Sequence, residues 1–159
     1  MTIRPRRSVL YMPGANARAL EKARTLDADA LILDLEDSVA GDRKKLASEM
    51  VQAYLKSADR KGPKLYVRVN ALDTGLTLSD LATIMQGRPD GIAFPKCVGQ
   101  RDLDLLATYL DALETREGIE KGRTKILTIA TESAAAVLAL MAAPAKHDRL
   151  IGHSWGGED

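Results

Sequence analysis

The sequence predicts an α/β fold built around a parallel sheet. Short apolar runs alternate with longer segments of helical period along the 159 residues, and no linker interrupts them. The runs are almost continuously apolar, as in Leu31-Ile32-Leu33, which is typical of parallel strands covered on both faces. Strand, helix and strand in repetition imply right-handed βαβ units, and we expect one domain over residues 1–159.

Six segments are predicted to be strands. Each is a run of apolar and β-branched residues that ends at a turn or a polar group. They are residues 8–12, 30–35, 64–69, 91–95, 125–130 and 149–153.

The intervals between these runs carry apolar residues at helical spacing, so that each set marks one helix face. The alanine-rich stretch 134–143 predicts a further packed helix. The three sets are Leu46, Met50 and Tyr54; Leu78, Leu81 and Met85; and Leu103, Leu106, Leu110 and Leu113.

Two architectures share this rhythm, an open doubly wound sheet and a (β/α)8 barrel. A complete barrel needs about 250 residues and seldom fewer than about 200, which argues against a complete barrel here. Only residues 154–159 follow the last predicted strand, so no helix covers it. We therefore expect the chain to be a fragment of a longer fold.

The composition excludes some classes of partner. Lys and Arg total 23 and Asp and Glu total 22. This balance does not give the excess of positive charge that is typical of proteins that bind nucleic acid or an anionic membrane. No apolar run reaches the roughly 20 residues that span a bilayer, and we expect no export signal, because no apolar segment follows the charged N-terminal residues. The single cysteine, Cys97, cannot form an internal disulfide. We expect a cytoplasmic protein that binds small molecules.

Charged residues follow nearly every predicted strand, at the edge where parallel α/β folds collect functional groups. Residues 34–38 hold three carboxylates, Arg68 lies in the third run, and Glu132 follows the fifth. Two carboxylates with waters suit Mg²⁺, and an arginine fork suits a substrate carboxylate. Such a site fits a small acid with a carboxylate beside a carbonyl or hydroxyl, and aldol or Claisen cleavage through an enolate.

Each of these residues also has a purely structural interpretation. Asp34 could bond only to neighbouring backbone or to an arginine, and Glu36, Asp37 or Glu132 could serve a helix N-terminus. Arg68 could pair with Glu36 or Asp37. Lys96 could form a salt bridge, and Cys97 is expected to be an inert core thiol.

The motifs resemble those of the citrate lyase beta-subunit-like enzymes of the HpcH/HpaI aldolase group, in the same order and across nearly the whole chain. Leu-Asp-Leu-Glu-Asp at 33–37 and Gly-Gly-Glu-Asp at 156–159 are the most specific elements. The matching segments are 7–14, 28–39, 67–70, 95–96, 132–134 and 155–159. Two departures are mild: Ser133 stands where Thr is more common, and Ala136 where Gly is common.

The resemblance implies a TIM-type barrel, incomplete here because the C-terminal strands and helices are absent. It implies a Mg²⁺-dependent carbon–carbon lyase, acting on a thioester such as citryl-, malyl- or citramalyl-CoA. A keto acid and an acyl-CoA would leave by way of a metal-stabilised enolate. It also implies a homo-oligomer, a trimer or hexamer.

Residue roles also follow from the resemblance. Mg²⁺ would lie between Glu132 and Asp159, and Arg68 would hold the substrate carboxylate. Asp37 and Glu36 would order metal-bound water or neighbouring groups. The remaining substrate-binding residues are Pro13, Gly14 and Lys96.

Two other functions remain open from the sequence. The first is a CoA-thioester hydrolase on the same scaffold, with water in place of the carbon leaving group. The second is a catalytically impaired fragment or subunit that only binds metal and keto acid.

Overall fold

The computed structural model describes residues 6–157, which form one parallel sheet of six strands. The strands follow the chain in the order β1-β2-β3-β4-β5-β6. Every boundary lies within one residue of the predicted position. The strands are β1 (Val9–Pro13), β2 (Ala30–Asp34), β3 (Lys64–Arg68), β4 (Gly91–Phe94), β5 (Lys125–Ile129) and β6 (Leu150–Ser154).

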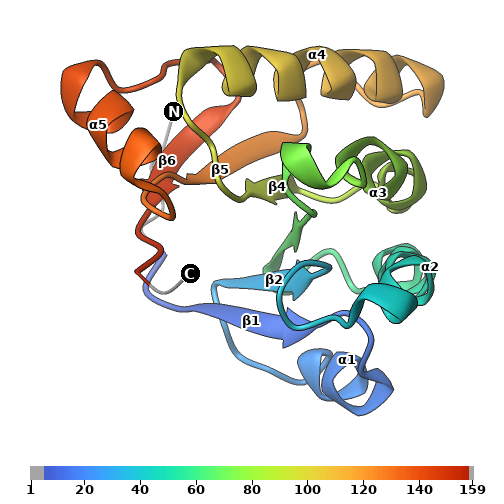
Figure 1. Ribbon diagram of the computed structural model, residues 1–159. Coiled ribbons are helices and arrows are strands. Elements are labelled where there is room, and N and C mark those ends of the chain that lie inside the picture. The colour runs from blue at the N-terminus through green and yellow to red at the C-terminus, as the bar shows by residue number, and fades with distance from the viewer. Residues whose placement is uncertain (1–5, 158–159) are drawn as a thin grey trace.

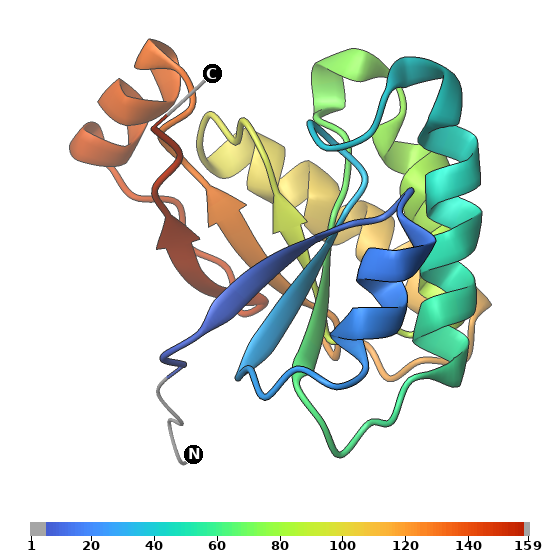
Figure 2. The ribbon, with the colours of Figure 1, turned by 90° about the horizontal axis from the view of Figure 1, so that it is seen from below.

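The strand order decides between the two architectures. A doubly wound sheet reverses its strand order at a switch point, whereas here each strand pairs in parallel with the next one along the chain. Right-handed crossovers in one direction place the helices on one side of a curved sheet, as Figures 1 and 2 show. The sheet is therefore of the barrel type and is not closed, in agreement with the prediction of an incomplete barrel.

Five α-helices and short 3-10 turns connect the strands within the described residues. The helices are α1 (Ala17–Ala23), α2 (Lys44–Ser57), α3 (Thr77–Ile84), α4 (Gln100–Arg116) and α5 (Ala134–Ala142). The 3-10 turns are Gly41–Arg43, Leu72–Thr74 and Met85–Gly87.

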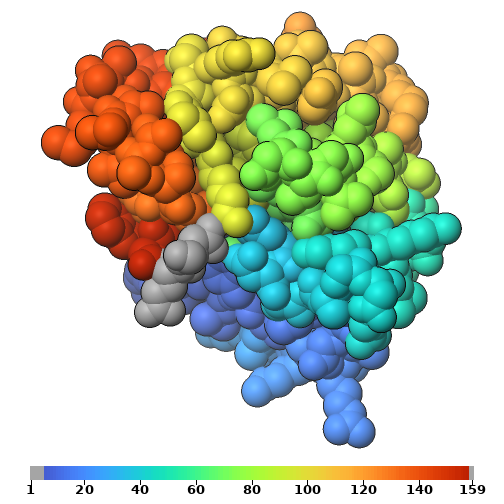
Figure 3. All heavy atoms as spheres, viewed as in Figure 1, coloured from blue at the N-terminus to red at the C-terminus, as the bar shows by residue number. Residues whose placement is uncertain are grey.

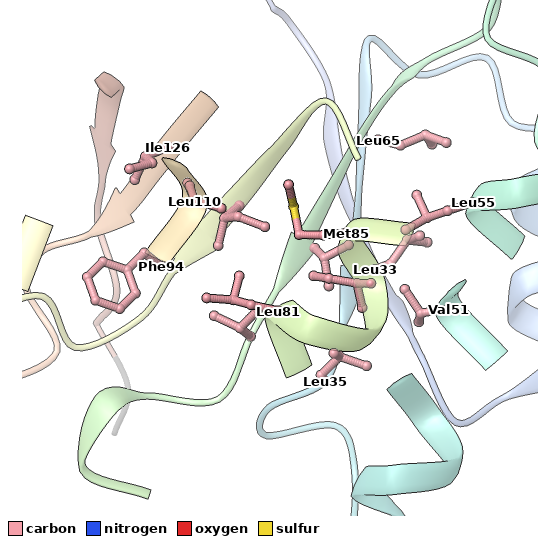
Figure 4. Packing of buried hydrophobic residues seen from close by; sticks show 14 of the residues in the cluster. Leu33, Leu35, Val51, Leu55, Leu65, Leu81, Met85, Phe94, Leu110 and Ile126 are labelled. Carbon is pink, nitrogen blue, oxygen red and sulfur yellow. The ribbon is translucent and has the colours of Figure 1, made fainter. Parts of the chain in front are cut away.

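The main core lies between the sheet and the helices (Figure 4). Alternate strand residues face this layer because successive side chains point to opposite faces of a strand. The four leucines predicted on α4 are all buried there, but Leu46 and Leu78 are 44% and 49% exposed. The buried face of α2 includes the predicted Tyr54 together with Ala47, Val51 and Leu55.

The alanine-rich segment forms α5, but the expected packing is wrong for most of its length. Only Ala136 is buried, while Leu138 and Met141 are 67% and 78% exposed. Figure 3 shows the segment, in orange, at one margin of the molecule against the start of α4. The helix forms because alanine and leucine favour it, and not because neighbours enclose it.

Candidate functional site

The β2–β3 register places Asp34 directly beside Arg68 at the carboxyl end of the sheet. Arg68 donates from Nε to Asp34 Oδ1 at 2.7 Å and from Nη2 to Asp34 Oδ2 at 2.9 Å, which is the bidentate geometry of a guanidinium and a carboxylate. Asp34 also accepts from the backbone N–H groups of Glu36 and Ser38. These bonds bear out the structural interpretation of Asp34.

The electrostatics of Asp34 follow from these contacts. The residue is 1% exposed, and burial alone would raise the pKa of its carboxyl. The hydrogen bonds from Arg68, Ser38 and the Glu36 backbone outweigh burial and hold the pKa of Asp34 below its usual range. Asp34 is therefore a charged anchor.

Arg68 reaches two further acids through Nη1. Its distances are 3.0 Å to Asp37 Oδ2 and 3.2 Å to Glu36 Oε2. The guanidinium lies over the ring of Tyr11, 5.0 Å from the centroid, in a cation–π contact that sequence analysis had not assigned. Asp37 is half exposed, whereas Arg68 is nearly buried. An incoming anion could therefore displace the Asp37 carboxylate from Nη1 of Arg68.

Glu36 differs from Asp34 in being buried with one carboxylate oxygen that accepts no hydrogen bond. Its Oε2 has no hydrogen-bond partner in the described part of the chain, since the approach of Arg68 is an ion pair outside hydrogen-bond geometry. Its Oε1 lies 3.8 Å from Lys96 Nζ. Burial first, and then the charges of Asp37 and Glu132, raise the pKa of Glu36 to about 7. A carboxyl of this kind can take up or release a proton near neutral pH.

Neither Glu36 nor Asp37 acts as a helix cap. The 3-10 turn that follows them begins after Ala40, and no side chain bonds to its N-terminus. The cap of α5 is likewise Ser133, whose hydroxyl accepts from the Ala136 N–H, and not Glu132. The capping interpretations of Glu36 and Asp37 are therefore wrong, whereas Glu132 directly precedes the Ser133 cap, as expected of a neighbour of the N-cap.

Glu132 lies at the carboxyl end of β5 and contacts the turn after β4. Its Oε2 accepts the backbone N–H of Lys96 at 2.6 Å. The turn after β6 also passes against it, because a Cβ added to Gly156 would lie 2.6 Å from Glu132 Cγ. Thr131 fixes this approach by bonding to both the N–H and the carbonyl of Gly156.

The other predicted metal ligand, Asp159, lies outside the described residues, three positions beyond Gly156. Within residues 6–157, no three His, Cys, Asp or Glu side chains are grouped as a metal site. The donor chemistry nevertheless fits a hard cation, because carboxylates outnumber positively charged groups at this edge of the sheet. The carboxylates are Asp34, Glu36, Asp37 and Glu132, and the positively charged groups are Arg68 and Lys96.

Pro13, the last residue of β1, lies beside Asp34, and Gly14 follows it. Gly14 donates its N–H to the Asp34 carbonyl at 2.8 Å, and a Cβ at Gly14 would lie 2.5 Å from that oxygen. Pro13 lines a shallow hollow on the helix side with Arg43. Cys97 is buried, and burial raises the pKa of its thiol, in keeping with a core position.

The fold is a barrel-type parallel α/β sheet, and charged side chains gather at the carboxyl ends of its strands. Residues 7–159 match the HpcH/HpaI aldolase/citrate lyase family. The chain belongs to this family, which agrees with the resemblance found in the sequence.

Two curated relatives are similar to the chain. The first is a (3S)-malyl-CoA thioesterase of Cereibacter sphaeroides, 42% identical over 121 residues, 72% of this chain and 42% of the relative. The second is the citrate lyase subunit beta of Escherichia coli, 36% identical over 156 residues, 98% of this chain and 51% of the relative. The chain thus spans about half the length of the curated relatives that it matches.

A solved structure is also similar, the protein CitE of Mycobacterium tuberculosis in complex with magnesium and acetoacetate. It matches with a TM-score of 0.62 and 25% identity over 98% of this chain and 56% of that chain.

No helix within residues 6–157 combines the length and apolarity that a membrane span needs.

The raised pKa of Glu36 predicts a specific pH dependence of stability. Between about pH 4.5 and 7 the unfolded state releases the Glu36 proton while the folded state keeps it, so folding loses stability as the pH rises. Glu36→Gln removes this loss. The variant should gain about 2–4 kcal/mol of unfolding free energy relative to wild type across this interval, measured by urea denaturation.

The control for this experiment is Glu49→Gln, at an exposed position on α2. It makes the same substitution where the side chain is exposed and so reports the effect of the amide itself. A pH-independent difference between Glu36→Gln and wild type would show that Glu36 ionises normally in the folded protein.

Proposed function

We propose that the chain carries the catalytic end of a Mg²⁺-dependent carbon–carbon lyase. Its substrate would be a hydroxyacyl-CoA thioester of the citryl-, malyl- or citramalyl-CoA type, cleaved to a keto acid and an acyl-CoA. The observation that carries the proposal is the grouping of Arg68, Glu36, Lys96 and Glu132 at one edge of the sheet. Similarity to a citrate lyase beta subunit supports it.

Arg68 is the residue that binds the carboxylate of the keto-acid portion. Asp34 keeps the guanidinium in one orientation, while the exposed Asp37 at Nη1 gives way to the substrate carboxylate. The substrate carboxylate replaces the Asp37 carboxylate, so the number of ion pairs that Arg68 makes stays constant. The substrate is then held by a guanidinium whose position is already fixed.

Glu132, with Asp159, would hold Mg²⁺. When bound, this ion would supply Lewis-acid stabilisation of the negative charge that develops on the carbonyl oxygen. It would also balance the excess of carboxylates around Arg68 and Lys96, so that an anionic substrate can approach.

Glu36 supplies proton chemistry in the same place. Cleavage releases the proton of the substrate hydroxyl and delivers one to the carbon that becomes the acyl-CoA methyl or methylene group. A buried carboxyl with a pKa of about 7 can hold such a proton at Oε2, and Lys96 Nζ near Oε1 stabilises the ionised form.

The second candidate is a thioester hydrolase, favoured by the 42% identity to a malyl-CoA thioesterase. The same groups would then position water for attack on the thioester carbonyl. In the third case the chain binds metal and keto acid without turnover.

Product analysis distinguishes these functions. With Mg²⁺ and citryl-, malyl- or citramalyl-CoA, a lyase releases a keto acid and an acyl-CoA, without free thiol. A hydrolase releases free CoA thiol, which a thiol reagent detects, and no keto acid. We expect keto acid from at least one of the three substrates. Thiol release alone from all of them would contradict the lyase.

Substitution of the proposed metal ligand gives a separate test. Glu132→Gln should weaken Mg²⁺-dependent pyruvate binding by at least about 100-fold in calorimetry, because a neutral amide replaces a charged ligand. Glu49→Gln is the matched control and should bind as the wild type does. Equal affinity of Glu132→Gln and wild type would remove Glu132 from the metal site.

A further inference from the structure

Lys96 has a backbone conformation that is unusual for its residue type. Its φ is 52°, in the left-handed region that glycine and asparagine normally occupy. Among the described non-glycine residues only Arg88, with φ 54°, shares it. A residue with a Cβ stays in this region only where its surroundings over-determine the conformation.

The two left-handed residues have different surroundings. Arg88 ends the 3-10 turn after α3, where its N–H bonds to the Met85 carbonyl and its side chain to the Glu117 carbonyl. Its conformation is thus the ordinary end of a helical turn. Lys96 ends no helix, and its N–H points at the carboxylate of Glu132, 2.6 Å from Oε2.

Lys96 also contacts two acids of the site, one through its backbone and one through its side chain. Its backbone holds Glu132, which follows β5, and its ammonium lies 3.8 Å from Glu36 Oε1, which follows β2. Pro95 is buried directly before it at the end of β4, so the turn has little freedom to relax.

We propose that Lys96 is the positioning residue for Glu132: its left-handed backbone aims the N–H that fixes the orientation of this carboxylate for a divalent cation. The inference rests on the proposed function, which makes Glu132 a metal ligand. Hydrogen bonds to metal-binding carboxylates commonly set their orientation and, with it, the affinity of the site.

The effect of the Lys96 backbone conformation on Mg²⁺ affinity can be measured separately from the effect of its charge. Lys96→Gly and Lys96→Val both lack the ammonium, but only glycine adopts the left-handed conformation without strain. Lys96→Gly should keep an Mg²⁺ affinity at least equal to that of wild type. Lys96→Val should bind Mg²⁺ about 10–100-fold more weakly than Lys96→Gly, measured by calorimetry with Mg²⁺ alone.

Arg88→Gly and Arg88→Val are the matched controls. They impose the same change of backbone preference at a turn away from the site. Their Mg²⁺ affinities should agree within about twofold, although Arg88→Val should unfold at a lower urea concentration than Arg88→Gly. A difference confined to position 96 therefore reports positioning of Glu132 and not general stability.

Equal Mg²⁺ affinity of folded Lys96→Gly and Lys96→Val overturns the positioning role. Circular dichroism checks folding, and Lys96→Ala takes the place of Lys96→Val if the valine variant is unfolded, with the same order expected. Failure of the wild-type chain to bind Mg²⁺ overturns the cation site itself, and the positioning role with it. The two failures are distinguishable, because the second appears before any variant is compared.

Discussion

The bidentate ion pair between Asp34 and Arg68 is the interaction on which the rest of the site depends. Asp34 is held by two backbone N–H groups, and Arg68 takes its orientation from Asp34. Arg68 in turn stacks on Tyr11 and faces Glu36 and Asp37. The parallel register of β2 and β3 brings the pair together, so the arrangement follows directly from the fold.

The same pair explains why neighbouring carboxylates differ in charge state. Asp34 takes two of the donors of Arg68, which leaves Glu36 a single, poorly directed approach in a buried position. The pKa of Asp34 is therefore lowered and that of Glu36 is raised to about 7. One acid anchors an arginine and the other can exchange a proton near neutral pH, because their different environments move the two pKa values apart.

Much of the fold and part of the site could be predicted from the sequence. Apolar runs such as Leu31-Ile32-Leu33 located the strands, and the acids after them located the edge of the sheet that carries the site. The contact between the Lys96 N–H and Glu132 could not be predicted, because a left-handed lysine leaves no composition or spacing signal. The exposure of α5 depends on which elements neighbour it, and its alanine-rich sequence does not specify them.

A double-mutant cycle on Asp34 and Arg68 tests the central claim most directly. Unfolding free energies would be measured by urea denaturation for Asp34→Asn, Arg68→Gln and the double variant. Because each single change removes the bidentate pair and leaves a buried charge without that partner, each should cost about 3–5 kcal/mol, and the double variant should cost little more than either one. Costs that add within about 0.5 kcal/mol would contradict the account, because the two residues would then be energetically independent.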